Sequence, residues 1–189
     1  MSRRMNLPPG RKKIVIPQFR QASADCDAVL KMWQTLESAI LQIFAKEQSN
    51  LSYEVLYRNA YNMVLHKHGE KLYTNVRHTV AKHLVAQATS IAGHNTATFM
   101  SLLQQEWKDF KLAITMVRDV CMYLDRTWVD QQKVAPVYDL GLGLFRDLVA
   151  RDDRIRSRLL TTMLGYIEVF ALMFRGVFML TYVWAPCNC

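Results

Sequence analysis

The sequence predicts an all-α protein folded as an antiparallel helical bundle. Glycine and proline are scarce, with 7 and 5 among 189 residues. Segments rich in leucine, methionine and alanine carry apolar residues at steps of three and four, which is the helical period. Short polar links join these segments, so successive helices should pack side by side in opposite directions. With 51% hydrophobic and 21% charged residues, the chain can bury a core in one domain.

The first predicted helix runs from Asp25 or Asp27, both suitable caps, to about Lys46, and Ser49-Asn50 breaks it. Its core residues recur at helical spacing: Val29, Met32, Trp33, Leu36, Ile40, Ile43 and Phe44.

The second predicted helix lies in the stretch Leu51–Tyr73. Ser52 suits the N-cap, Leu51 and Leu56 occupy the two positions of a hydrophobic staple, and Gly69 is expected to end the helix. Its apolar stripe is Leu56, Ala60, Met63 and Val64. A third helix should follow to Gly93, with Leu72, Val76, Val80, Leu84, Ala88 and Ile91 as its core face.

The fourth segment has the most regular period in the chain and predicts one long helix, straight or kinked. Its seam is Phe99, Leu103, Trp107, Phe110, Ile114, Val117, Cys121, Leu124 and Trp128. Pro136 suits the first turn of a fifth helix with the apolar face Leu140, Leu144, Phe145 and Leu148. Asp152-Asp153 is interpreted as the cap of a sixth helix rather than as a catalytic pair.

A second stripe on the second helix lies about a quarter turn from its core stripe and consists of Tyr53, Glu54, Tyr57, Arg58 and Tyr61. Two interpretations stay open. Half-exposed aromatic residues beside charges of both signs are typical of protein–protein interfaces. Tyrosines flanking a core stripe can also be boundary residues with a packed ring and a solvated hydroxyl. By the same reasoning Tyr123, beside the fourth seam, is a boundary tyrosine.

The basic charge is concentrated in the N-terminal arm. The first twenty residues hold six basic groups and no acid, whereas the remaining body has 18 basic and 16 acidic residues. Such an arm can bind nucleic acid, but a solvated end is the favoured interpretation. Within the arm, Ile14, Val15 and Ile16 form an apolar patch that would need a partner groove for burial.

The residues indicate no enzyme, metal site or cofactor. The sequence lacks a P-loop and the GxGxxG, HExxH and GxSxG motifs. His66 and His68 point to different helix faces, so they do not form a metal-binding pair. Cys187 and Cys189 supply two possible metal ligands, but the sequence offers no further ligands to complete a site. The scattered cysteines fit a reducing compartment, so the cytoplasm or nucleus is expected, and no secretory signal is evident at the start.

Several long runs resemble the N-terminal region of the cullins, scaffold subunits of ubiquitin ligases. They are SYEVLYRNAYNMVLHKHGEKLY, MVRDVCMYLDRTWV at Met116–Val129, VYDLGLGLFRD at Val137–Asp147 and IRSRLLTTMLGYI at Ile155–Ile167, and Trp33 also matches. The resemblance covers roughly Asp27 to Ile167. It implies a helical bundle of the cullin-repeat type, with one repeat and the start of a second.

The resemblance also implies a function. The first of these runs is similar to the branch of the family that binds BTB-domain substrate adaptors. Contacts would come from Ser52, Tyr53, Glu54, Tyr57, Arg58, Tyr61, Tyr123 and Arg126, with arm contacts from Ile14, Val15 and Ile16. Such a protein has no small-molecule substrate. A chain without the region that recruits the RING subunit would be a non-catalytic fragment that competes with full-length cullin.

Three parts of the chain are therefore expected: an N-terminal arm at 1–24, a cullin-type helical domain at 25–167 and an apolar tail at 168–189. The tail departs from the family and is expected to cover part of the exposed bundle end. Two alternatives stay open: a basic helical protein that binds nucleic acid through the arm, and a membrane protein anchored by the segment Val169–Ala185.

Overall fold

The computed structural model describes residues 26–94 and 96–183, and every element in these ranges is helical. The N-terminal arm, with Ile14, Val15 and Ile16, lies outside them. The elements are α1 (Cys26–Phe44), α2 (Tyr53–Leu65), α3 (Gly69–Gly93), α4 (Thr96–Val120), α5 (Met122–Leu124), the π-helix η1 (Asp125–Val129), α6 (Asp130–Gln132), α7 (Val137–Phe145), the π-helix η2 (Arg146–Ala150) and α8 (Asp153–Val183). The predicted all-α class is confirmed.

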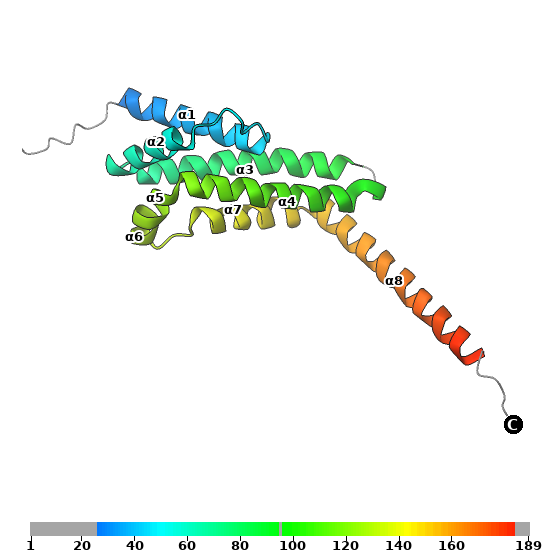
Figure 1. Cartoon of the computed structure of the whole chain (residues 1–189). Helices are drawn as coiled ribbons and strands as arrows, with labels where there is room; N and C mark the ends of the chain where they lie inside the picture. The colour runs from blue at the N-terminus through cyan, green and yellow to red at the C-terminus, as the bar shows by residue number, and fades with distance from the viewer. Residues whose placement is uncertain (1–25, 95, 184–189) are drawn as a thin grey trace, which may run out of the picture.

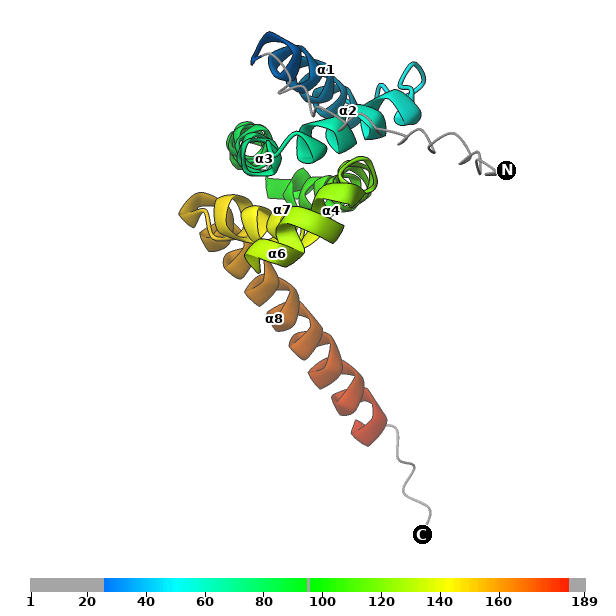
Figure 2. The same cartoon turned by 90° about the vertical axis from the view of Figure 1, so that its left-hand side faces the viewer.

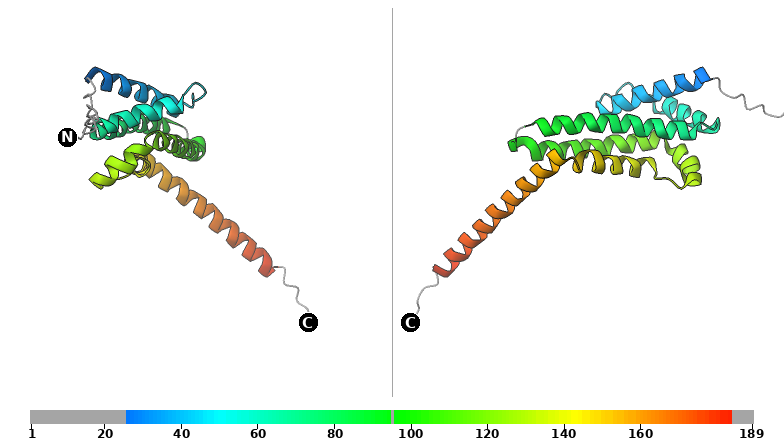
Figure 3. Two further views of the ribbon diagram at one scale, coloured as in Figure 1. Left: turned by 60° about the vertical axis from the view of Figure 1, so that its left-hand side comes forward. Right: turned by 180° about the vertical axis from the view of Figure 1, so that it is seen from behind.

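The helices form an elongated bundle in which α3 and α4 run antiparallel through the middle (Figure 1). The helices α1 and α2 cover one side of this pair, and α7 with η2 covers the other (Figure 2). The short elements α5, η1 and α6 turn the chain at one end of the bundle. From the opposite end α8 leaves the bundle and extends away from it, as the views from two further sides also show (Figure 3).

One continuous core runs through these layers, and the predicted apolar faces supply most of it. The core face of α3 is buried as expected, and so are Val29, Trp33, Leu36, Ile40 and Ile43 of α1. At the end of α1, the Lys46 ammonium donates to the Asp109 carboxylate of α4 at 2.6 Å. This hydrogen bond lowers the pKa of Asp109 and raises that of Lys46.

The end of α2 differs from the prediction, because Gly69 does not end the helix. The last helical residue is Leu65, and Lys67 adopts the left-handed conformation with φ 65°. The Lys67 and His68 N–H groups donate to carbonyls of the last turn, at 3.0 and 2.9 Å, in a Schellman motif. Gly69 instead begins α3 against an indole: a Cβ there would lie 2.7 Å from Trp128 Cγ. A close approach, rather than a cap, requires this glycine.

The fourth segment is interrupted rather than uniform. After α4 the chain turns at Cys121, continues as α5 and then widens into η1. The helical period therefore predicted the seam correctly, and the kinked alternative is the observed one. A π-turn closes its hydrogen bond one residue farther along the chain than an α-turn does. The residues that follow it therefore face a different direction.

The core face of α7 also differs from the prediction. The buried residues are Val137, Gly141 and Phe145, continued by Val149 in η2, and of the predicted face only Phe145 is among them. Gly141 explains why α7 is rotated about its axis relative to the prediction. A Cβ at this position would lie 2.4 Å from Ile114 Cγ1, so the glycine lets α7 approach α4 closely.

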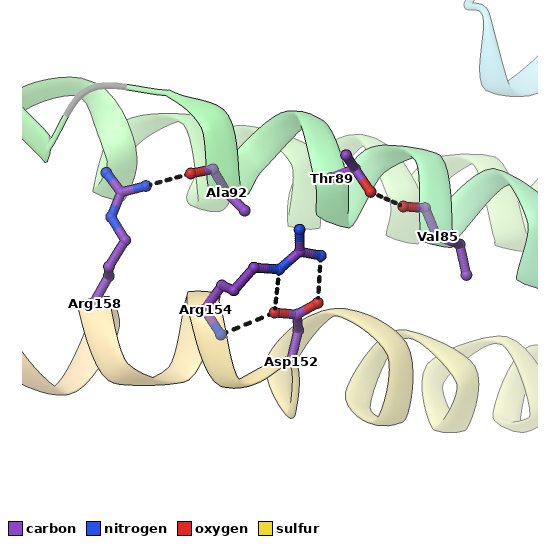
Figure 4. Close-up of polar contacts among 6 residues, drawn as sticks. All are labelled: Val85, Thr89, Ala92, Asp152, Arg154 and Arg158. Atoms are coloured by element: carbon purple, nitrogen blue, oxygen red, sulfur yellow. Dashed lines mark hydrogen bonds and ion pairs between the residues drawn. The ribbon is translucent and has the colours of Figure 1, made fainter.

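Polar contacts of one arginine join α8 to the C-terminal end of α3. Arg158 donates to the carbonyl oxygen of Ala92 at 2.8 Å (Figure 4). It also donates to the carbonyl oxygen of His94 at 2.7 Å, and the two bonds satisfy carbonyls at the C-terminal end of α3. The Arg158 guanidinium also lies over the Phe99 ring at 4.5 Å. Asp152 accepts a hydrogen bond from the Arg154 N–H at 2.9 Å, so the predicted role of Asp152 as a cap is confirmed.

The expectation that the tail covers the bundle end is wrong for the residues whose burial is described. The helix α8 runs without a break through residue 167, and residues 168–172 are all exposed. No helix among the described residues is long and apolar enough to span a membrane.

The glycine contacts predict opposite effects of the same substitution at two positions of α7. Gly141→Ala should lower the free energy of unfolding by about 1–3 kcal/mol, because the new methyl group overlaps Ile114. Gly143→Ala should raise it by up to about 1 kcal/mol, because a Cβ there meets nothing within 4 Å and alanine favours helix. Urea unfolding of both variants measures the difference. Equal stabilities would contradict the close approach of α7 to α4.

His83 gives the fold a predicted dependence on pH. Its ring stacks on Phe44 with centroids 4.2 Å apart, and burial lowers its pKa from 6.5. A histidine with a lowered folded pKa disfavours protonation, so its stabilising contribution is complete above pH 6.5 and is lost as the pH falls through the lowered value. The free energy of unfolding should therefore decrease on acidification below pH 6.5.

His83→Phe keeps an aromatic ring against Phe44 and should remove this part of the pH dependence. His78, exposed on the same helix, is the control, because His78→Phe should leave the pH dependence due to His83 unchanged. The free energy of unfolding of the two variants, measured at a series of acidic pH values, tests this prediction. Identical pH profiles of both variants would refute the role of His83.

Candidate partner-binding surface

The helix α2 separates its buried face from the stripe singled out in the sequence. Leu56, Ala60 and Met63 are buried against the bundle. Tyr53 and Tyr57 are each 40% exposed, so part of each ring is accessible to solvent. Glu54 and Arg58, one turn apart, form an exposed ion pair beside these tyrosines. The stripe is therefore an accessible surface with apolar rings and charges of both signs.

A ring contact joins this stripe to a distant part of the chain. The half-buried Tyr61 and Tyr123 have ring centroids 4.5 Å apart and an interplanar angle of 51°. This tilted arrangement is a favourable aromatic pair geometry. It connects α2 with α5, so the stripe and Tyr123 belong to one surface, called here the tyrosine surface: Tyr53, Glu54, Tyr57, Arg58, Tyr61 and Tyr123.

The other two predicted site residues flank this surface. Ser52 is exposed and precedes α2 in an extended conformation, without a side-chain hydrogen bond to the helix. Arg126 is exposed on η1, beyond Tyr123. Their roles in binding stay predictions, as does the role of the arm.

The position of Tyr123 depends on contacts that the sequence did not reveal. The Asp125 carboxylate accepts a hydrogen bond from the Val137 N–H at 3.0 Å, and the Tyr73 hydroxyl donates to the Ala135 carbonyl at 2.9 Å. The Tyr73 and Trp128 rings lie 5.3 Å apart. These contacts tie the segment after Tyr123 to α3 and to the start of α7.

Burial changes two pKa values beside Tyr123. It raises the pKa of the Cys121 thiol to about 12, so this cysteine is a packed core residue rather than a nucleophile. Burial is also the main cause that raises the pKa of Asp125, while the Val137 N–H acts in the opposite direction. Among the described residues no group of three or more His, Cys, Asp or Glu could hold a metal ion.

One exposed residue of α2 was missed by the sequence reasoning. Val55 is 44% exposed and lines an open groove between α1 and α2 together with Leu51 and Gln34. Ser52 also lines the groove, whereas the residues of the tyrosine surface do not. An apolar residue outside both stripes of α2 was the signal that could have identified it.

Comparison with known proteins agrees with this architecture. Residues 33–169 match the cullin alpha solenoid domain. The chain is 42% identical over 164 residues to Cullin-3 of Dictyostelium discoideum, covering 87% of this chain and 21% of that protein. It is 46% identical over 138 residues to Cullin-3B of Arabidopsis thaliana, covering 73% of this chain and 19% of that protein.

A third relative, Cullin-3 of Caenorhabditis elegans, is 38% identical over 162 residues, covering 85% of this chain and 21% of that protein. The chain thus spans about a fifth of the length of these relatives. Both the domain match and the identities extend over most of the chain, so the protein belongs to the cullin family.

Proposed function

We propose that this chain is a scaffold segment of a cullin-type ubiquitin ligase that binds BTB-domain substrate adaptors through the tyrosine surface. The observation that carries the proposal is the contact between Tyr61 and Tyr123. It assembles residues from α2 and α5 into one exposed aromatic surface, in a chain whose core is already filled by other residues of the same helices.

The chemistry of the tyrosine surface suits a protein partner. Tyrosine rings supply a large apolar contact area at low entropic cost, and their hydroxyls can bond to a partner backbone. The Glu54–Arg58 pair, with both side chains well exposed, provides the polar rim that specific interfaces contain. An adaptor on this surface would bury a standard interface of about 1,600 Å².

In this proposal the chain supplies binding and positioning but no chemical step. Cullins are scaffold proteins, and the proposed role asks only for a rigid helical body and an accessible surface. The layers of the bundle meet the first requirement, because buried residues from α1 to α8 form one core.

Substitution on the tyrosine surface should weaken adaptor binding strongly. Tyr61→Lys should raise the Kd for a BTB domain by thirtyfold or more, a loss of ~2 kcal/mol, because it places an ammonium where a ring packs against Tyr123. Tyr57→Lys, at a position 40% exposed, should also weaken binding while the core stays intact. Isothermal titration of purified protein measures both constants.

Leu112→Lys is the matched control, because it adds the same charge at an exposed apolar position of α4, 57% exposed, outside the tyrosine surface. It should leave the Kd unchanged, and circular dichroism should show the same helical content in all variants. Binding unaffected by both tyrosine substitutions would disprove the proposed surface.

Binding at the tyrosine surface also predicts competition. The purified chain should displace a full-length Cullin-3 relative from a shared BTB domain, since both would occupy the same face of the adaptor. A pull-down with increasing amounts of the chain measures this, with the Tyr57→Lys variant as the inactive control. Simultaneous binding of chain and relative to one adaptor site would contradict it.

Salt dependence distinguishes this proposal from nucleic-acid binding by the arm. Phosphate binding weakens by orders of magnitude between about 50 and 200 mM salt, whereas an aromatic interface is much less sensitive. Adaptor affinity should therefore change little over this range, and substitution of Arg3 and Arg4 should have little effect. A steep loss with salt would indicate that the arm carries the binding.

A further inference from the structure

A cavity of about 290 Å³ lies where the end of α1 meets α3 and α4. Pockets that bind small molecules begin at roughly this size, about 300 Å³. The cavity lies at the end of α1, on one side of the α3–α4 pair, whereas α8 leaves the bundle on the side of α7 (Figure 2). Packing within the bundle therefore forms this cavity, and the course of α8 does not affect it.

Aromatic rings form the apolar wall of the cavity. Phe44, the last residue of α1, stacks on the His83 ring with centroids 4.2 Å apart. On α4, the Phe110 ring lies nearly parallel to that of Phe44 at 6.1 Å. Phe145 of α7 also lines the cavity, 5.2 Å from Phe110. These mutual contacts hold the rings in place, so the wall is ready to accept a flat apolar group.

Polar acceptors without a protein partner also line the cavity. The imidazole of His83, the amide of Gln87 and the carboxylate of Glu106 form no hydrogen bond to another side chain or to the backbone among the described residues. Burial lowers the pKa of His83, so at neutral pH the ring is uncharged and one of its nitrogens accepts hydrogen bonds. The cavity therefore offers three acceptors to a ligand that brings donors.

The charges of the cavity favour a cation. Among its described lining residues, Glu106 and Asp109 are acidic and Lys46 is basic. The Lys46 ammonium donates to Asp109 at 2.6 Å, and the Gln105 amide donates to the two oxygens of the same carboxylate at 2.9 and 3.0 Å. Asp109 is thus neutralised within the protein, whereas the negative charge of Glu106 remains for a ligand.

We propose that this cavity binds a small organic cation, an amine with a flat aromatic body. The body would pack against the rings of Phe44 and Phe110, which also attract a cation through their faces. The ammonium has three N–H donors for the acceptors of Glu106, His83 and Gln87. Its bond to the Glu106 carboxylate would be charge-assisted and therefore the strongest of these contacts. No residue of the tyrosine surface lines the cavity, so this function is separate from adaptor binding.

Three probes of similar shape test the proposal: phenethylamine is a cation, phenethyl alcohol is neutral and phenylacetate is an anion. Titration of the whole chain, followed by the NMR shifts of its backbone amides, measures each Kd and locates the site. Phenethylamine should bind most tightly, with shifts centred on His83, Gln87 and Glu106, and phenylacetate should bind most weakly. Equal affinity for all three probes, shifts centred elsewhere, or no response to millimolar phenethylamine would overturn the proposal.

The variant Glu106→Gln tests the role of the carboxylate, because it removes the charge and keeps the size of the side chain. It should weaken phenethylamine binding by about tenfold or more and leave the Kd of phenethyl alcohol unchanged. Glu47→Gln is the matched control, since Glu47 lies in the loop after α1 but does not line the cavity. It should bind phenethylamine like the wild type, as should Tyr57→Lys. An equal loss in Glu106→Gln and Glu47→Gln would indicate general attraction to acidic groups and would contradict a specific site.

Discussion

The structure depends on one hydrogen bond at the reversal of the chain after α4. The Val137 N–H donates to the half-buried Asp125 carboxylate at 3.0 Å, across a π-helix, a short α-helix and a loop. A buried carboxylate is costly unless a donor satisfies it, so this bond both compensates Asp125 and sets where α7 begins. The same reversal presents Tyr123 to α2. The core and the candidate surface therefore share one constraint.

Two glycines allow close packing between helices of the bundle. Gly69 admits the Trp128 side chain of η1 to the start of α3, and Gly141 admits Ile114 of α4 to the face of α7. Both occur at ordinary helical backbone, so their lack of a side chain matters rather than their conformational freedom. Left-handed conformations are instead adopted by Lys46, Lys67 and Lys133 at helix ends. At these positions lysine adopts the left-handed conformation that ends a helix, and glycine allows two helices to approach closely.

Exposed large apolar side chains occur on the bundle, as at Val85 and Leu112, and along α8 beyond it, as at Leu164 and Ile167. The tyrosine surface differs from these positions, because it combines aromatic rings with the Glu54–Arg58 ion pair. This mixture of apolar and polar groups is typical of interfaces between proteins.

The sequence by itself determined the helical class, the order of the helices, the core faces of α1 and α3 and the aromatic stripe of α2, because each is a local periodic pattern. It could not determine the end of α2, the rotation of α7 or the direction of α8. Gly69 was interpreted as the end of a helix until Trp128 was seen against it, and no local pattern marked Gly141 as the place where Ile114 packs. Tyr123 looked like a boundary residue until Tyr61 was found beside it. Such contacts join residues far apart in the chain, and no local pattern records them. Only the tertiary structure decided them, because close packing selects which of several compatible faces each helix buries.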